Sequence, residues 1–80
     1  HLAQEECACR ICIMNVNKPN MIMGFTSVLS SAGINLPNMS NKSRGTAAYT
    51  LIDCDSVPDE ETIEKLRQID GVKKIRVIYY

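Results

Sequence analysis

Asparagines at close spacing are the side chains of this 80-residue chain that could support binding chemistry. Asn15, Asn17 and Asn20 lie in the stretch NVNKPN, which follows an apolar run and precedes a helical pattern. A carboxamide donates and accepts hydrogen bonds, so it can bind an ammonium group through its oxygen and a carboxylate through its nitrogen. The free backbone amides at a helix start add a site for an anion. This combination suits a small zwitterion such as an amino acid.

Asn35 opens the next extended segment, and we expect it to reach the same ligand across an interface between two copies of the chain. The alternative interpretation is that these asparagines only form turns and a helix cap, which is common for asparagine in loops.

The cysteines Cys9 and Cys12 form a C-x-x-C pair, with Cys7 before them and Cys54 far along the chain. A metal or redox site with this spacing needs both sulfurs to converge in a loop or at a helix start. Here the pair leads into a predicted strand, where side chains three residues apart point to opposite faces. We therefore interpret the cysteines as reduced structural thiols in the cytoplasm and expect no metal or other cofactor. A cysteine-based metal-binding module remains an alternative.

Catalytic patterns are missing from the sequence. His1 lies at the chain end, and Asp53 and Asp55 mark the end of a predicted strand rather than an acid and base pair. The chain is therefore not expected to be an enzyme.

The elements that must position these residues follow from the apolar pattern. Residues 8–16 are apolar on both faces, as in a central strand. Apolar residues from Met21 to Ala32 recur at helical spacing, and Gly33 suits the end of that helix. Residues 34–42 are extended and polar, and Pro37 lacks a donor, which predicts an edge strand.

A turn at residues 43–45 makes the strand over residues 46–54 the partner of an antiparallel hairpin. Helix signals then run from Ser56 or Val57 to Gly71, and residues 72–80 alternate apolar and basic side chains. This order predicts an α+β, ferredoxin-like βαββαβ sandwich, with a four-stranded antiparallel sheet and two helices on one face. Right-handed crossovers place the strands in the order fourth, first, third, second.

Charge excludes some partners and suggests another. Nine basic residues balance nine acidic ones, so no long-range field favours nucleic acid or an anionic membrane, and no run is long enough to span a bilayer. No ionisable residue lies between Lys18 and Lys42, and the first helix has a small, uncharged outer face. We therefore expect a homodimer through the first helix and the second, edge strand, with an interface that includes Met23, Gly24, Ser27, Ser31 and Pro37.

Most of the chain, residues 10–79, resembles the ACT domain, a ligand-sensing module, and most closely the C-terminal regulatory domain of D-3-phosphoglycerate dehydrogenase. The similarity lies in ICIMNVNKPNMIMGFTSVLSSAGINL, AAYTLIDCD and IDGVKKIRVIY. It implies an allosteric sensor of L-serine, bound between two domains whose sheets join edge to edge. Residues 10–80 would form the regulatory domain, and residues 1–9 an N-terminal extension or linker and the start of the first strand. The catalytic domains of an NAD-dependent parent dehydrogenase would lie outside this chain.

The resemblance also implies site residues. Asn17 and Asn35 match the ligand asparagines of the family. Asn15 stands where members of the family carry histidine, and Asn20 stands where glycine is usual. The expected ligand-binding set is Asn15, Asn17, Asn20, Ile22 and Asn35. Because two of these positions depart from the family pattern, a dimerisation module without a ligand is the alternative function.

Overall fold

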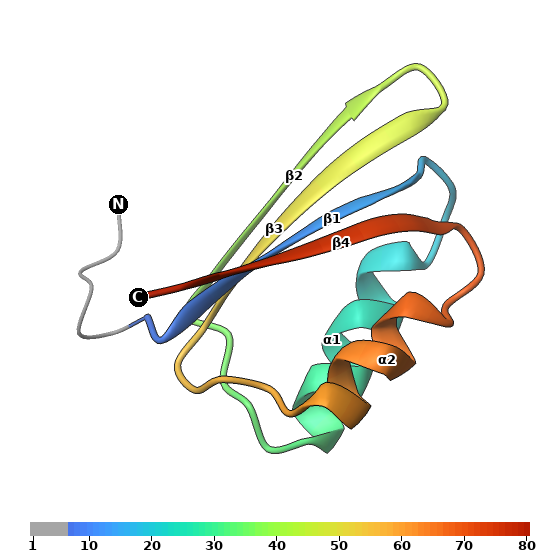
Figure 1. Ribbon diagram of the computed structural model, residues 1–80. Coiled ribbons are helices and arrows are strands. Elements are labelled where there is room, and N and C mark those ends of the chain that lie inside the picture. Colours follow the sequence, from blue (N-terminus) through green and yellow to red (C-terminus); the bar gives the residue numbers. More distant parts are fainter. Residues whose placement is uncertain (1–6) are drawn as a thin grey trace.

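The computed structural model describes residues 7–80 (Figure 1), so His1 lies outside the described residues. The elements are β1 (Cys9–Val16), α1 (Met21–Ser31), β2 (Asn38–Arg44), β3 (Ala47–Cys54), α2 (Glu60–Arg67) and β4 (Val72–Tyr79). The strands form one four-stranded sheet in the order β2-β3-β1-β4, and every neighbouring pair is antiparallel. The predicted ferredoxin-like βαββαβ plan and its strand order are confirmed.

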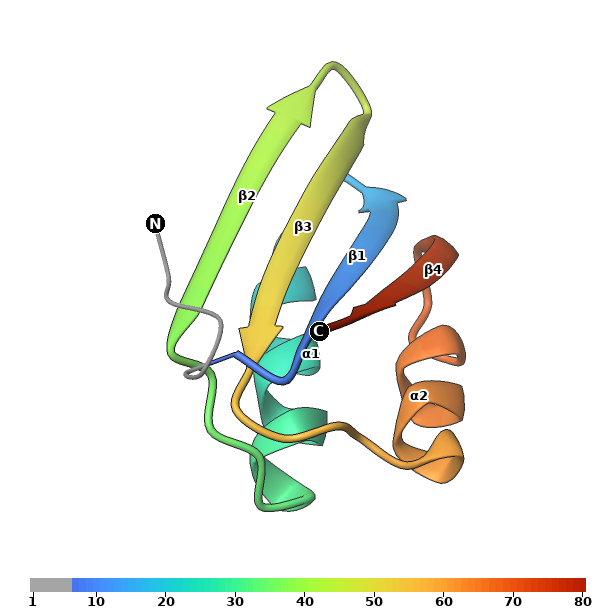
Figure 2. The same ribbon diagram turned by 60° about the vertical axis from the view of Figure 1, so that its left-hand side comes forward.

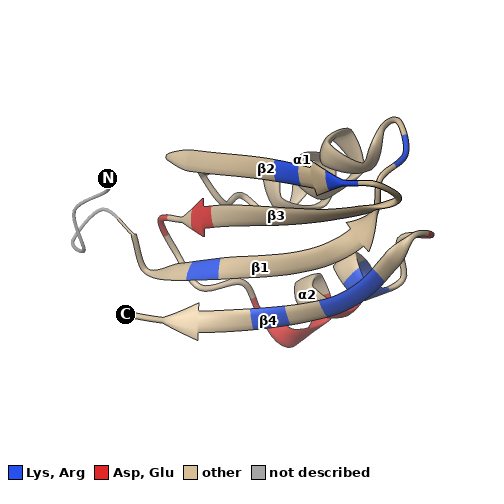
Figure 3. Cartoon of the chain, turned by 90° about the horizontal axis from the view of Figure 1, so that it is seen from above, with Lys and Arg blue, Asp and Glu red and all other residues tan. Residues whose placement is uncertain are grey.

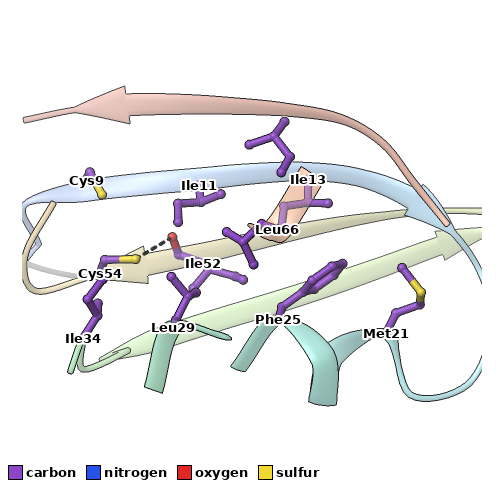
Figure 4. Packing of buried hydrophobic residues seen from close by; sticks show 11 residues of the cluster. Cys9, Ile11, Ile13, Met21, Phe25, Leu29, Ile34, Ile52, Cys54 and Leu66 are labelled. Carbon is purple, nitrogen blue, oxygen red and sulfur yellow. Dashed lines mark hydrogen bonds between the residues drawn. The ribbon is translucent and has the colours of Figure 1, made fainter. Parts of the chain in front are cut away.

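Both helices cover the same face of the sheet, with α1 on the side of β2 and β3 and α2 on the side of β4 (Figure 2). Residues of β1 alternate between fully buried and half-buried, because one face of this central strand packs on the helices and the other faces away from them. Phe25 and Leu29 of α1 and Leu66 of α2 pack onto Ile11 and Ile13 (Figure 4). This layer between sheet and helices is the hydrophobic core.

All seven residues of the edge strand β2 are exposed. Pro37 precedes the strand rather than lying in it, and the strand continues through Arg44, which the sequence had placed in the turn. The turn consists of Gly45 and Thr46. Its first residue has a positive φ of 63°, and glycine adopts this conformation readily. The predicted edge position is confirmed, while both predicted boundaries of this strand were wrong.

The second helix is shorter than its sequence signals predicted. Its N-cap is Asp59, whose carboxylate accepts a hydrogen bond from the Thr62 N–H at 2.8 Å, so the helix begins after Asp59 rather than near Ser56. It ends at Arg67, and the loop from Gln68 to Gly71 connects it to β4. Within residues 7–80 the structure contains no helix with the length and apolar character of a membrane span.

Candidate functional site

The predicted ligand asparagines lie at two ends of α1. Asn15, Asn17 and Asn20 lie at the end of β1 and before the start of α1, and Asn35 follows the opposite end of this helix. The 11 residues of α1 extend over about 16 Å, at 1.5 Å per residue. Within one chain, a small ligand can therefore contact the first group or Asn35, but not both.

Asn15 is built into the interior, with 2% of its surface exposed. Its Oδ1 accepts a hydrogen bond from Thr50 Oγ1 at 3.0 Å, and its Nδ2 donates to the Val16 carbonyl at 2.9 Å. Thr50 Oγ1 in turn accepts from Asn41 Nδ2 at 2.8 Å. This polar chain joins β1, β3 and β2 beneath the junction. Asn15 therefore has little surface left for a ligand and supports the strands that carry the junction.

A Thr50→Val variant tests this polar chain. The substitution keeps the side-chain shape but removes the only donor to the buried Asn15 Oδ1 among the described hydrogen bonds. We expect the free energy of unfolding to fall by about 2 kcal/mol, the cost of a buried unsatisfied polar group. Urea denaturation measures it. Thr26→Val is the matched control, because the Thr26 hydroxyl bonds only to the Met23 carbonyl of its own helix, and an equal loss in both variants would contradict this role.

Asn17 and Asn20 are exposed at the mouth of the junction. Asn17 is held by the β2–β3 turn, because its Nδ2 donates to the Gly45 carbonyl at 3.1 Å and its N–H donates to the Thr46 carbonyl at 2.8 Å. Asn20 has a φ of 70° and makes no capping bond with its side chain. This left-handed conformation favours glycine and tolerates asparagine, which accounts for the residue type at this position.

The start of α1 is a suitable anion site. Its first turn contains no acidic residue, so the unpaired N–H groups and the positive end of the helix dipole are not neutralised from within the helix. Lys18, the one cation of the junction among the described residues, is bound by Asp70 at 2.8 Å, and it lowers the pKa of that carboxyl. The backbone amides therefore remain the groups best placed for a carboxylate.

Asn35 is oriented by an acid that the sequence interpretation overlooked. The Asp55 carboxylate accepts from the Asn35 N–H at 3.1 Å and from Asn35 Nδ2 at 3.0 Å. Sequence reasoning treated Asp55 as the end of a strand, although an acid next to a strand end can also bind a neighbouring loop. This bond uses one of the two N–H donors of the Asn35 amide and fixes its orientation, and no described hydrogen bond involves its oxygen, which can accept from a ligand.

The small residues of α1 lie differently from the sequence expectation. A Cβ on Gly24 would lie 3.6 Å from Ile69 Cδ1, and Ser27 and Ser31 line the groove between α1 and α2. Gly24 therefore faces the second helix and not the outer surface, whereas Ser27 and Ser31 are exposed along the groove between the helices. Their place in an interface stays a prediction. Figure 2 places β2 on the other side of α1. The flank turned that way carries the half-buried Ile22 and Thr26, next to the exposed Met23.

The cysteines do not converge on one site. Cys9 faces the core, and Cys12 lies on the opposite face of β1, as the strand prediction required. Burial raises the pKa of Cys9, and it raises the pKa of Cys54 to about 12. Among residues 7–80 no group of His, Cys, Asp and Glu side chains has the arrangement of a metal site. The pair Cys9 and Cys12 cannot bind one ion, because the sheet separates the two sulfurs.

The sequence matches no family model and no curated protein. Solved structures share the fold. The crystal structure of the ACT domain from the GTP pyrophosphokinase of Chlorobium tepidum is 18% identical over 90% of this chain and 97% of that one, with a TM-score of 0.70. The regulatory subunit of aspartate kinase from Thermus thermophilus is 15% identical over 92% of this chain and 53% of that one, with a TM-score of 0.69.

A homoserine dehydrogenase from Thiobacillus denitrificans contains a similar segment. It is 19% identical over 98% of this chain and 19% of that one, with a TM-score of 0.71. None of these three proteins is a D-3-phosphoglycerate dehydrogenase. The likeness establishes that the chain has the fold of the Chlorobium tepidum ACT domain.

Proposed function

We propose that this chain is an ACT-type regulatory domain that binds a small amino acid, L-serine first among them, between two copies. Its parent would be a D-3-phosphoglycerate dehydrogenase whose catalytic domains lie outside the chain. One observation supports the proposal: Asn17 and Asn35 lie at opposite ends of α1, and β2 is an edge strand of the sheet. Antiparallel pairing of β2 with a second copy would bring the two asparagines together.

The backbone of β2 has hydrogen-bonding groups available for this pairing. The Asn17 N–H donates to the Thr46 carbonyl, which sets the hydrogen-bond pattern of the β1–β3 pair. The backbone N–H and C=O groups of even-numbered β3 residues therefore point toward β1, and those of odd-numbered residues point toward β2. Their partners on β2 are the even-numbered residues from Asn38 to Arg44. The N–H and C=O groups of the odd-numbered residues therefore point away from the sheet: Met39, Asn41 and Ser43.

A two-fold axis at Asn41 satisfies these groups in an isologous, antiparallel pairing of two β2 strands. Met39 then opposes the second copy's Ser43, and Lys42 opposes the second copy's Ser40. Arg44 opposes the second copy's Asn38, so no like charges lie directly opposite each other, which would destabilise the pairing. The start of one β2 lies beside the end of the other. This geometry brings the second copy's Asn35 toward the turn that holds Asn17.

Each end of an amino acid has a matching group in this arrangement. The first-turn amides of α1 bind the carboxylate. Nitrogen atoms of Asn17 and Asn35 already donate to Gly45 and Asp55, so both side-chain oxygens are left to accept from the ammonium and from a hydroxyl. Ile22, half-buried on the flank beside β2, would limit the space for the ligand side chain. Binding across two copies couples ligand occupancy to association, which is what regulation requires.

Isothermal titration with L-serine tests the proposal, with glycine, L-valine and D-serine as comparison ligands. We expect saturable heat with L-serine. An Asn35→Ala variant should bind about tenfold more weakly or worse, because a hydrogen bond to a charged group contributes about 1.5 kcal/mol or more. Gln68→Ala is the matched control, since it removes an exposed amide at the end of α2.

The dimerisation module without a ligand makes the opposite prediction. It assembles through the same β2 edge, yet no amino acid at millimolar concentration gives heat or shifts the unfolding temperature. Asn35→Ala then leaves assembly unchanged and there is no ligand response to lose. If L-serine gives the same binding heat and affinity with the parent chain and with Asn35→Ala, the ligand binds elsewhere and the proposed site is contradicted.

A further inference from the structure

The face of the sheet opposite the helices combines an apolar floor with a basic rim. Figure 3 shows the basic positions on β2 and β4. The floor consists of Cys12 and Met14 from β1 and Tyr49 and Leu51 from β3, and these residues line one shallow pocket. Tyr49 is 51% exposed, so within the described residues this floor is open to solvent. No described element covers this pocket. We call this surface the open face.

Cations surround the floor on both sides. Lys42 of β2 and Lys74 and Arg76 of β4 are exposed, and none of the three is in an ion pair with a described carboxylate. Their place on the open face follows from the register, since Lys42 pairs with Tyr49, Lys74 with Met14 and Arg76 with Cys12. Among the described residues, the acid on this face is Asp53. Its Oδ1 lies 2.7 Å from Arg10 Nε in an ion pair.

Acidic side chains gather on the other side of the molecule. Asp59, Glu60, Glu61 and Glu64 belong to α2 and its cap, in the helical layer behind the sheet (Figure 3). The balanced total charge of the chain therefore conceals a basic open face and an acidic second helix. Such separation steers a partner of opposite charge toward the open face.

Two classes of occupant fit poorly. A second copy docking face to face would bring Lys42, Lys74 and Arg76 against the same cations. Single-stranded RNA is bound by stacking of several bases on aromatic side chains, whereas this floor has one aromatic residue, Tyr49, among sulfur and aliphatic groups.

We propose that the open face docks an acidic amphipathic helix of a partner protein. Its apolar side chains would pack on Met14, Leu51 and Tyr49, and its carboxylates would meet Lys42 on one side and Lys74 and Arg76 on the other. The distance between the strands that carry these cations fits such an occupant. Three strand spacings separate β2 from β4, about 14 Å, and a helix with its side chains is about 10 to 12 Å across.

A labelled helical peptide of about four turns tests this inference, with leucines along one face and glutamates along the other. The matched peptide carries lysine at every glutamate position, and oligouridine serves as the nucleic-acid probe. Fluorescence anisotropy with the whole chain should show saturable binding of the glutamate peptide that weakens as salt increases. Chemical-shift changes in the protein should concentrate on Met14, Tyr49 and Leu51.

Charge reversal locates the docking surface. The double variant Lys74→Glu with Arg76→Glu should bind the glutamate peptide at least about tenfold more weakly. The control, Lys65→Glu with Arg67→Glu on the exposed face of α2, should bind it like the parent chain. Circular dichroism checks the fold, and Lys42→Glu on the opposite rim replaces the β4 variant if that variant unfolds.

Four outcomes overturn the inference. They are the absence of saturable binding, equal binding of the lysine peptide, equal loss in the α2 control, and tighter binding of oligouridine than of the glutamate peptide. None of them bears on the amino-acid site, because the open face lies on the other side of the sheet from α1.

Discussion

A Ser43→Pro variant is expected to be monomeric and to lose its response to amino acids. The Ser43 N–H points away from β3, so proline removes a donor from the free edge while the β2–β3 ladder keeps its bonds. In the proposed dimer two intermolecular hydrogen bonds are lost by symmetry, and two proline rings enter the interface. Together these changes should raise the dimer dissociation constant about 100-fold, equivalent to about 2.7 kcal/mol. Sedimentation velocity over a range of protein concentrations measures it.

Ser43→Ala is the matched control, because it removes the hydroxyl and keeps the backbone N–H. It should associate like the parent chain and bind ligand with the same heat. A Ser43→Pro chain that still dimerises would show that β2 does not form the interface. If that chain also retained serine binding, both the edge pairing and the shared site would be refuted.

The second large effect is expected from Arg10→Met. Asp53 is buried on the open face of β3, and the Arg10 guanidinium binds it through two contacts, Nε to Oδ1 at 2.7 Å and Nη2 to Oδ2 at 3.2 Å. Removing one member of a buried ion pair leaves an uncompensated charge, which costs about 3 to 5 kcal/mol. The Arg10 side chain is 36% exposed, so solvent screens part of the interaction and we expect the lower limit, about 3 kcal/mol. Urea denaturation at neutral pH measures the loss.

The pH dependence identifies the cause of this loss. Hydrogen bonding to Arg10 lowers the pKa of Asp53 below its ordinary value of about 3.9, so the pair stabilises the fold above about pH 4 and this contribution is lost as pH falls further. In Arg10→Met, burial without the guanidinium should raise the pKa of Asp53, so protonation stabilises that folded chain as pH falls. The difference between the two proteins should therefore narrow from neutral pH to about pH 3.

The double variant Arg10→Met with Asp53→Leu supplies the control. It replaces both charges by apolar groups and should recover much of the stability lost in the single variant. A difference between Arg10→Met and the parent chain that stays constant with pH would instead assign the loss to packing of the arginine stem.

The sequence predicted the fold because several local signals agreed with one topology. Strand and helix periods alternate in the order that a split βαβ plan requires, and Pro37 independently marks the segment that this plan places at the sheet edge. Cys9 and Cys12 were separated correctly for a similar reason, since a strand sends side chains three residues apart to opposite faces. These predictions depend only on local geometry and chain connectivity.

The site was less predictable because it depends on which elements lie beside one another. Helical spacing identifies an apolar stripe on α1 but does not say which flank meets α2, so Gly24 was assigned to the outer face although it lies against Ile69. Asn15 occurs at an inward position near the end of β1, and its burial depends on Thr50, which is 35 residues away. The exact position of the β2–β3 turn was also missed, because it is set by the positive φ of Gly45, which the residue pattern does not reveal.

The arrangement of sulfur atoms also provides a natural labelling site for experiments on the open face. Of the four cysteines, Cys7, Cys9 and Cys54 are buried and Cys12 is half-buried in the floor of that surface. Maleimide reacts with an accessible thiolate, and burial suppresses both accessibility and ionisation at Cys9 and Cys54. A fluorophore attached to the unmodified protein should therefore be carried by Cys12, where its emission would report directly on whatever docks there.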